Sequence, residues 1–437
     1  MLIAGSRRGN RQPSDEELVE PVRQRSHGMM SSSSPVSVVP GERIVRLLLL
    51  VLFALSLAVL AAIALYIFQK KPHIDYSATN RLADLTYLET WLAILATGAL
   101  ACLWRRGLVI GFAVFLLLIA EAGAQIYVYV STGGTYQPEP LPSEQKFEPH
   151  PLLVGVPKPG SFAGIVHDSH HRRRTDNPGK AADARVIFTY GGSTTYDLAN
   201  NDMETWQSDL SRQLGANFSV QNLGVPGYTS VENLIQTLFD FRDLAPACAL
   251  YFEGFNDVRN SHVRGLKVDY SDFDLPLQRG NLGLNYPGFL ANNLLFVRAA
   301  IGLFSESEVH VEGTVSGDVD PRVSKIYVEN MSLIGEVARH FGVRAVFIPA
   351  VANWQQLEGS HALGWIRFVE HKDLKRLLYA IDEDLHRAAE NSGAAFVDAP
   401  LQQDWTPEDF SDSVHFNAAG AKKFAASIAP AIADLCR

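Results

Sequence analysis

Short apolar runs alternate with amphipathic segments from about Arg185 onward, and this alternation constrains the fold of the 437-residue chain more than any other feature. Short apolar runs bounded by turn residues are typical of buried strands, whereas apolar residues recurring every three or four positions are typical of helices. Strands that alternate with helices form parallel βαβ units, which predicts a doubly wound parallel sheet in a flavodoxin-like three-layer α/β sandwich. The predicted strands are 186–190, 219–223, 248–252, 343–348 and 395–397, and the predicted helices are 204–214, 231–244, 323–341, 372–391 and 418–435.

Two regions near this domain do not follow the pattern. Residues 258–320 fit neither period, and we expect them to form an insertion or lid over the carboxyl edge of the sheet. Residues 131–182 are interpreted as a linker and N-terminal extension, because the stretch up to about Gly160 is rich in Pro and Gly. The predicted catalytic domain therefore spans residues 183–437.

Residues 47–130 contain long apolar runs that predict about three transmembrane helices. The run 47–68 carries no charge and is long enough to cross roughly 30 Å of hydrocarbon. It is too long for the apolar core of a cleavable signal peptide and lacks a clear small-residue cleavage site, so an uncleaved anchor is favoured. The runs 86–104 and 107–130 are separated by two arginines at 105–106, which indicates a hairpin of membrane helices.

Positive charge predicts the orientation of these helices. Arginines lie before the first run and at 105–106, and both groups belong on the cytoplasmic side by the positive-inside rule. Lys70 and Lys71, in the loop between the first two runs, argue the other way. We expect a disordered cytoplasmic tail at 1–46 and a multi-pass protein of a bacterial-type inner or plasma membrane. Residues 131–437 then lie outside the cytoplasm.

A single acid, Glu121, interrupts the third apolar run. A carboxyl group inside a membrane is costly and by default suggests a function. If the helix ends earlier than the apolar run, Glu121 is instead an interfacial residue. The sequence leaves these two interpretations open.

Composition and motif searches exclude several classes of function. The net charge of −9 argues against a nucleic-acid partner, which would require a basic face. Cys102, Cys248 and Cys436 lie far apart with no CxxC spacing, so the sequence indicates neither a zinc site nor a disulfide framework. A GxxxxGK[ST] phosphate-binding loop is absent from the sequence. No cofactor and no metal are expected.

A histidine- and arginine-rich stretch has two interpretations. His167, His170 and His171 are followed by three arginines at 172–174, and the histidines alone suggest a metal site. No carboxylate or cysteine pattern accompanies them, so a solvated basic loop near the active site is favoured.

Polar residues follow the ends of several predicted strands and precede the last helix. In an open parallel sheet, ligands bind beyond the carboxyl ends of the strands. Ser193 lies in a Gly-Gly-Ser turn after the first strand, and His415 can activate it as a base while Asp412, three residues earlier, orients the imidazole. The backbone amides of Ser193 and Gly227 and the side-chain amide of Asn256 are candidate oxyanion donors.

Each of these signals is weak alone, because Gly-Gly-Ser turns and Asp-x-x-His sequences are common, and Asn256 also fits an ordinary helix cap. Their order and spacing together resemble the SGNH, or GDSL-like, hydrolase family, a resemblance that covers roughly residues 183–437. The four family blocks match Ser193, Gly227, Asn256 and His415, and the family aspartate matches Asp412. Gly192 departs from the family pattern, where Gly-Asp-Ser is usual, so substrate contacts are expected to differ.

The resemblance implies ester chemistry through an acyl-enzyme. The expected function is a membrane-anchored serine esterase acting on O-acyl esters, with acetyl groups of a cell-envelope polysaccharide or lipid as the leading substrate. The alternatives are an O-acyltransferase with the same Ser193–His415–Asp412 triad and a non-catalytic glycan-binding member. An intact set of catalytic residues argues against the last alternative, since a binding module does not need it. The sequence does not identify membrane-protein partners.

Overall fold

The computed structural model describes residues 107–132, 145–284, 288–304, 313–358 and 366–437, together with the single residues 47, 50, 51 and 54. The predicted tail at 1–46 and the predicted membrane runs 47–68 and 86–104 lie outside the described residues, apart from those four positions. The third apolar run corresponds to helix α3 (Gly107–Thr132). Within the described parts of the chain, none of the helices has the length and apolarity required to cross a membrane.

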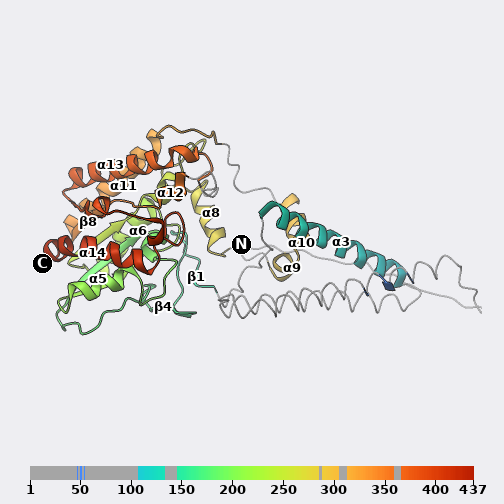
Figure 1. Cartoon of the computed structure of the whole chain (residues 1–437), viewed down its shortest axis with the longest axis horizontal. Coiled ribbons are helices and arrows are strands. Elements are labelled where there is room, and N and C mark those ends of the chain that lie inside the picture. The colour runs from blue at the N-terminus through green and yellow to red at the C-terminus, as the bar shows by residue number, and fades with distance from the viewer. Residues whose placement is uncertain are drawn as a thin grey trace, which may run out of the picture.

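A five-stranded parallel sheet forms the centre of the globular part (Figure 1), as the alternation of apolar runs predicts. Its strands are β5 (Arg185–Gly191), β6 (Phe218–Asn222), β7 (Cys248–Phe252), β8 (Arg344–Ile348) and β9 (Ala395–Phe396). Their spatial order is β6-β5-β7-β8-β9, and every neighbouring pair is parallel. The chain passes from β5 to β6 on one side of β5 and then crosses to β7 on its other side, so a topological switch point lies between β5 and β7. Ligands bind at such points in doubly wound folds.

Helices cover both faces of the sheet, which gives three layers (Figure 1). On one face α11 (Pro321–His340) packs against both α6 (Ser230–Asp243) and α13 (Leu374–Ser392). On the other face α5 (Trp206–Leu214) packs against α14 (Ala418–Leu435). The strands are buried from both sides, which explains why they are continuous apolar runs rather than alternating ones. The shorter elements are α12 (Trp354–Glu358) and the 3₁₀ turns His371–Asp373, Ala399–Gln402 and Pro407–Asp409.

Residues from Gln145 onward, within the segment predicted as a linker and N-terminal extension, pack against the globular domain. Two short hairpins form there, β1 (Phe147–Glu148) with β2 (Val156–Pro157) and β3 (Gly160–Phe162) with β4 (Ile165–His167). Their apolar side chains pack in a small second core with residues of the catalytic half. This core consists of Phe147, Leu153, Val154, Ile165, Tyr196, Val225 and Tyr228.

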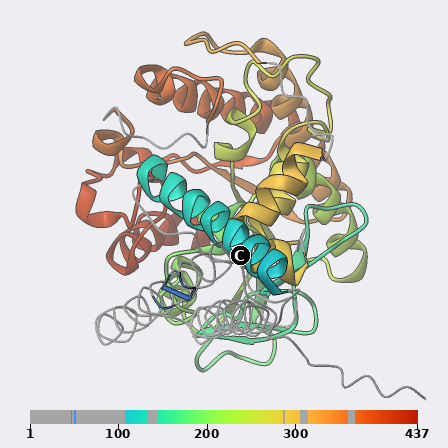
Figure 2. The same cartoon turned by 90° about the vertical axis from the view of Figure 1, so that its right-hand side faces the viewer.

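The predicted insertion contains three helices in its described parts, α8 (Asp274–Asn281), α9 (Phe289–Asn293) and α10 (Leu295–Phe304). Helix α8 lies on the catalytic domain, whereas α9 and α10 lie beside α3 (Figures 1 and 2). The buried carboxylate of Glu121 on α3 accepts a hydrogen bond of 2.9 Å from the backbone N–H of Phe296 in the first turn of α10. The interpretation of Glu121 as an interfacial residue required the helix to end before the apolar run does. Helix α3 instead continues past Val130.

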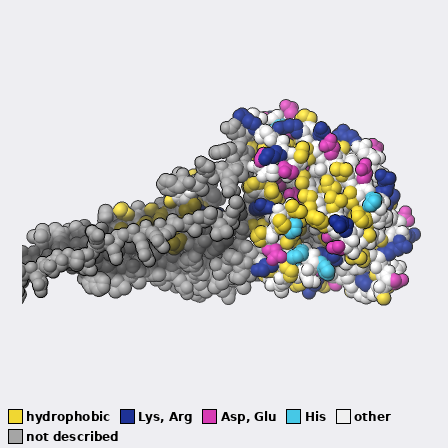
Figure 3. Space-filling model, turned by 180° about the vertical axis from the view of Figure 1, so that it is seen from behind, with side chains coloured by type: hydrophobic (Ala, Val, Ile, Leu, Met, Phe, Trp, Pro, Cys, Tyr) yellow, Lys and Arg dark blue, Asp and Glu magenta, His cyan; other side chains and the backbone are white. Residues whose placement is uncertain are grey.

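A disulfide joins Cys248, at the start of β7, to Cys436, just after α14. The sequence gives no sign of this bond, because the two cysteines are 188 positions apart and no local spacing relates them. The bond ties the central strand of the sheet to the C-terminal helix. On the face of the globular domain shown in Figure 3, basic and acidic side chains are interspersed, and apolar side chains gather near the middle.

Candidate active site

The turn that carries Ser193 is fixed by close backbone contacts. Gly191 ends β5 with a φ of +148°, and an added Cβ there would lie 2.3 Å from the carbonyl oxygen of Phe252. The hydroxyl of Thr195 donates to that same carbonyl at 2.9 Å and so ties the turn to β7. Ser193 is the first residue of the short helix α4 (Ser193–Tyr196), so its backbone N–H has no partner within the helix.

The structure brings Ser193, His415 and Asp412 into one hydrogen-bonded chain, as the sequence predicts. Nε2 of His415 lies 2.7 Å from Oγ of Ser193, and Nδ1 of His415 lies 2.7 Å from Oδ2 of Asp412. A carboxylate only accepts hydrogen bonds, so Nδ1 carries the proton and Nε2 is the free base of the neutral ring. This arrangement allows Ser193 to donate its hydroxyl proton to His415.

Asp412 is held in its orienting position by the backbone of its own loop. Its Oδ1 accepts from the N–H groups of Val414 and His415 at 2.9 Å and 2.8 Å. Partial burial alone would raise the pKa of Asp412, but the hydrogen bonds and charge of His415, together with these backbone donors, hold it below its ordinary value. The carboxylate therefore stays ionised. Phe416, the residue after His415, stacks on Phe252 of β7 and anchors the loop to the sheet.

The candidate oxyanion donors meet around Gly192. An ideal Cβ built on Gly192 would lie 2.5 Å from Nδ2 of Asn256 and 3.3 Å from the carbonyl oxygen of Tyr228. Gly227 has a φ of +87° and precedes Tyr228, whose N–H donates to Val225, which is the geometry of a β-turn with glycine at its third position. In the part of the chain that the structure describes, the N–H groups of Ser193 and Gly227 have no acceptor.

Asn256 lies in the short helix α7 (Phe255–Val258), which follows β7. It does not cap this helix, because the cap position is occupied by Gly254 without a side-chain hydrogen bond. One hydrogen of its Nδ2 is used on the carbonyl oxygen of Tyr228 at 2.7 Å. An amide nitrogen carries two hydrogens, so a second donor remains for a substrate oxygen.

Arg173 is a site residue whose position the sequence analysis did not predict. Its side chain is buried, not part of a solvated loop, and pairs with Asp202 at 3.0 Å. Its guanidinium also donates to the carbonyl oxygen of Tyr196, the last residue of the nucleophile helix, and to those of Asp197 and Asn200, which follow it. The run of three arginines was the only signal in the sequence.

Other residues of the basic stretch have different environments. His167 is buried, with its ring nitrogens 3.0 Å from the carbonyl oxygen of Lys158 and 2.8 Å from the hydroxyl of Tyr196. Burial lowers the pKa of His167. Arg174 remains about half exposed, so only part of the stretch is solvated as predicted. No group of three metal-ligating side chains gathers among the described residues, here or elsewhere.

Asp197, which follows α4, carries a fully buried carboxyl group, whereas Asp412 of the triad is partly exposed. It ends α4 in a left-handed conformation, with a φ of +65°. Its oxygens accept from the N–H of Trp206 at 2.8 Å and from Nδ2 of Asn200 at 2.7 Å. Burial raises the pKa of Asp197 to about 7, although Arg173 and His415 act in the opposite direction.

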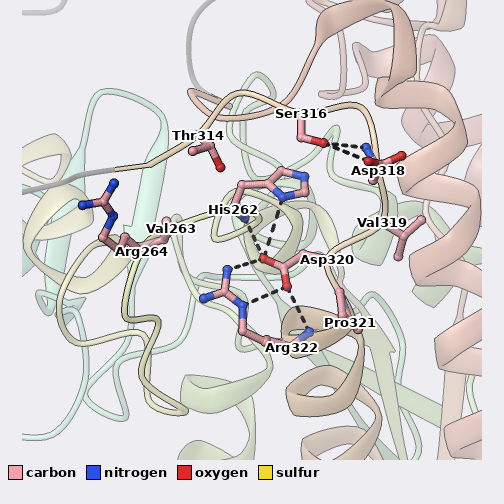
Figure 4. Close-up of a pocket in the computed structure, with 10 residues that line it drawn as sticks. All are labelled: His262, Val263, Arg264, Thr314, Ser316, Asp318, Val319, Asp320, Pro321 and Arg322. Atoms are coloured by element: carbon pink, nitrogen blue, oxygen red, sulfur yellow. Dashed lines mark hydrogen bonds and ion pairs between the residues drawn. The ribbon is translucent and has the colours of Figure 1, made fainter.

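A pocket of about 390 Å³ lies away from the triad (Figure 4). It is lined by residues 262–264, which come after α7, and by residues before and at the start of α11, namely Thr314, Ser316, Asp318, Val319, Asp320, Pro321 and Arg322. At its centre, Arg322 pairs with Asp320, which also accepts from the N–H of His262. Neither Ser193 nor His415 lines this pocket, so it is not the catalytic cleft.

Comparison with known proteins gives structural similarity only. No protein-family model and no curated protein matches the chain. A GDSL-like lipase from Bacteroides thetaiotaomicron is 15% identical, with 59% of this chain and 91% of that chain covered and a TM-score of 0.35. The lipase/acylhydrolase from Enterococcus faecalis is 14% identical, with 57% and 96% covered and a TM-score of 0.35.

The psychrotrophic esterase EstA from Pseudoalteromonas sp. is 11% identical, with 57% of this chain and 97% of that chain covered and a TM-score of 0.34. At these identities and TM-scores the likeness carries no conclusion about what this chain does. What this chain can catalyse follows from the hydrogen bonds and contacts around Ser193.

Proposed function

We propose that the chain is a serine esterase that cleaves O-acyl esters through an acyl-enzyme on Ser193. The observation that carries this proposal is the continuous chain of hydrogen bonds from Ser193 through His415 to Asp412, with 2.7 Å at each of its two steps. A nucleophile within reach of a base that a third group orients is the arrangement that activates a serine hydroxyl. A glycan-binding module has no use for it.

The residues divide the reaction in the following way. Oγ of Ser193 attacks the acyl carbonyl carbon while Nε2 of His415 takes the hydroxyl proton. The carbonyl oxygen becomes an oxyanion, which the N–H groups of Ser193 and Gly227 and the Nδ2 of Asn256 stabilise as its charge develops. The C–O bond to the leaving alcohol breaks, and His415 returns the proton to that alcohol. Water then attacks the acyl-enzyme by the same steps and releases the acid.

The proposed substrate class is O-acetyl groups of a cell-envelope polysaccharide or lipid, outside the cytoplasm. The proposed anchor consists of about three membrane helices in residues 47–130. Support comes from the apolar runs, from the arginines that flank them, and from the Cys248–Cys436 disulfide, since such bonds persist in oxidising compartments. O-acyl transfer is the alternative, because a sugar hydroxyl can replace water in the second step.

A labelling experiment tests the chemistry. A fluorophosphonate probe should label the full chain at Ser193, and Ser193→Ala should abolish both the labelling and the hydrolysis of p-nitrophenyl acetate. The Ser193→Ala/His415→Ala double variant should be little worse than either single variant, because the two residues act as a unit. Independent, multiplying losses would contradict the shared role. Product analysis with acetylated glycans in the presence of acceptor sugars then separates hydrolysis from transfer.

A topology experiment tests the compartment. A reporter that is active only outside the cytoplasm, fused after Arg437, should be active, and a reporter restricted to the cytoplasm should be silent at the same position. Alkylation of cysteines in intact cells should leave Cys248 and Cys436 unmodified unless a reductant is added first. An active cytoplasmic reporter would refute the proposed orientation.

A further inference from the structure

The side-chain amide of Asn256 has a fixed orientation, set by the carbonyl oxygen of Tyr228 at its nitrogen and by Arg259 at its oxygen. Its Oδ1 accepts a hydrogen bond of 2.8 Å from Nη2 of Arg259, and both residues are buried. A guanidinium only donates hydrogen bonds, so the end of the amide that faces Arg259 must be the oxygen. The nitrogen therefore faces Gly192 and the nucleophile, the side on which a substrate oxyanion would lie.

Arg259 is held in turn by the insertion. Its Nη1 lies 3.3 Å from Oδ1 of Asp274, the first residue of α8, whose side chain is almost completely buried. Arg259 follows directly after α7, a helix of only one turn. The contact with Asp274 thus holds the guanidinium of Arg259 against a second element, α8. Hydrogen bonds therefore connect Asn256, beside the catalytic turn, through Arg259 to Asp274 on α8.

The same helix also supports the second oxyanion donor. Gln278 lies one turn after Asp274, so the two side chains leave α8 on the same face. The side chain of Gln278 packs directly on Gly227, where an added Cβ would lie 2.6 Å from Oε1 and 2.7 Å from Cγ. Gln278 is buried, and its Nε2 has no hydrogen-bond partner among the described residues. One face of α8 therefore lies behind both Asn256 and Gly227.

We infer that α8 positions the oxyanion hole, with the Asp274–Arg259 pair orienting the Asn256 amide and Gln278 supporting the Gly227 turn. The inference rests on the proposed esterase function. It makes Arg259 a positioning residue, since it acts on the reaction only through Asn256. It also means that the 258–320 insertion contributes to catalysis by positioning the oxyanion donors, whether or not it covers the substrate as a lid.

A double-mutant cycle on the detergent-solubilised full chain tests this inference, with hydrolysis of p-nitrophenyl acetate as the readout. Arg259→Met should lower kcat about tenfold, the order expected for losing one hydrogen bond from a charged donor, with KM nearly unchanged. Asn256→Ala/Arg259→Met should be no slower than Asn256→Ala alone, because Arg259 has nothing left to orient. Arg259→Lys should recover part of the loss. Losses that multiply in the double variant would overturn the inference.

Two further variants separate positioning from folding. Arg259→Met leaves the buried Asp274 without its partner, so Arg259→Met/Asp274→Asn removes the lone carboxylate and should restore the melting temperature while kcat stays low. A wild-type kcat in that variant would overturn the inference. Arg322→Met is the matched control, because Arg322 pairs with the buried Asp320 in the separate pocket, and its kcat should equal the wild-type value.

The outcomes also distinguish this inference from the esterase proposal. If Ser193→Ala remains active, the proposed function fails whatever the Arg259 variants show. If Ser193→Ala is inactive and Arg259→Met turns over at the wild-type rate, only the role of α8 fails. An increase in KM alone in Arg259→Met would mean that α8 binds substrate without orienting Asn256, which also contradicts the inference.

Discussion

Gly192 shows how a single residue shapes this active site. The chain departs here from the Gly-Asp-Ser pattern of the family that it resembles, and the structure gives a steric reason. A Cβ at this position would lie 2.5 Å from Nδ2 of Asn256, which is closer than real Cβ contacts come. Glycine before the nucleophile thus allows the amide donor to approach the backbone on which Ser193 lies. A larger residue requires Asn256 to move.

Asn256→Ala should lower kcat by about 10²- to 10³-fold with little change in KM, because the lost donor acts mainly as charge develops on the substrate oxygen. Gly192→Ala should lower kcat in the same direction by displacing that donor. Steady-state kinetics and thermal melting on the same samples check both variants. Gly123→Ala is the control, since an added Cβ on Gly123 meets no atom of the described residues within 4 Å.

An ordinary structural role for Asn256 gives a different result. A lost helix cap would cost about 1 kcal/mol of stability and leave kcat intact. A normal kcat with a lowered melting temperature would therefore remove Asn256 from the active site. The cap position of α7 is already occupied by Gly254, which is why we expect the kinetic result.

At the scale of elements, a carboxylate on α3 joins that helix to α10. Glu121 is buried and accepts from the N–H of Phe296 at 2.9 Å and from Nε2 of Gln125 at 2.6 Å. The N–H groups in the first turn of a helix have no partner within that helix. Glu121 thus serves α10 as a cap supplied by another helix, which links the third apolar run to the insertion.

Glu121→Leu should lower the melting temperature of the detergent-solubilised chain, by the ~1 kcal/mol that a lost helix cap costs. Glu121→Gln should lose less, because its amide oxygen still accepts from Phe296. Differential scanning fluorimetry of the two variants beside the wild type measures the difference. Equal melting temperatures for all three proteins would show that the cap adds nothing to stability.

The sequence predicts elements well where the signal is local. The strand 248–252 and the helix 418–435 have the bounds of β7 and α14, because burial of an apolar run or stripe is visible in its own residues. Contacts between residues that are far apart in the sequence are not visible in a local pattern of this kind. Arg173 binds backbone carbonyls, which every residue has, and the Cys248–Cys436 pair is separated by 188 positions. Neither could be derived from spacing.

The same distinction holds within the active site. Ser193, Asp412 and His415 were predicted because their residue types and order carry the chemistry, and the structure places them in contact. Arg259 and Asp274 were not predicted, because their importance depends on how α8 packs against α7. The fold of the insertion cannot be derived from a segment that follows neither the strand nor the helix period.

At the scale of the whole molecule, several buried carboxyl groups make stability depend on pH. Burial raises the pKa of Asp197 to about 7 and of Asp240 to about 6, and it raises the pKa of Asp382 well above its ordinary value. In the unfolded chain aspartate titrates near pH 3.9. Between about pH 4 and pH 7 the folded state therefore binds more protons than the unfolded state, so the free energy of unfolding falls as the pH rises.

We accordingly expect the melting temperature of the full chain to be higher at pH 5 than at pH 8, as measured by scanning calorimetry in buffers of equal ionic strength. Asp412, Asp320 and Asp409 have lowered pKa values and oppose this trend only below about pH 4, where they become protonated. The buried His167, whose pKa burial lowers, opposes it below about pH 6.5, where histidine in the unfolded chain becomes protonated. Asp382→Asn keeps an acceptor for the N–H of Ala350 but does not titrate, so its melting temperature should change less with pH. A melting temperature that rises from pH 5 to pH 8 would contradict this account.

The Cys248–Cys436 bond also changes the distances that the unfolded chain must search. Along the backbone, Ser193 and His415 are 222 positions apart. The path from Ser193 to Cys248, across the sulfur atoms and back from Cys436 to His415, is roughly a third of that length. Because the entropy of closing a loop grows with the logarithm of its length, this shortcut lowers the cost of bringing nucleophile and base together by about 1 kcal/mol. The oxidised chain therefore starts refolding with its two catalytic halves already near one another, whereas the reduced chain must find the same encounter by diffusion over the full length.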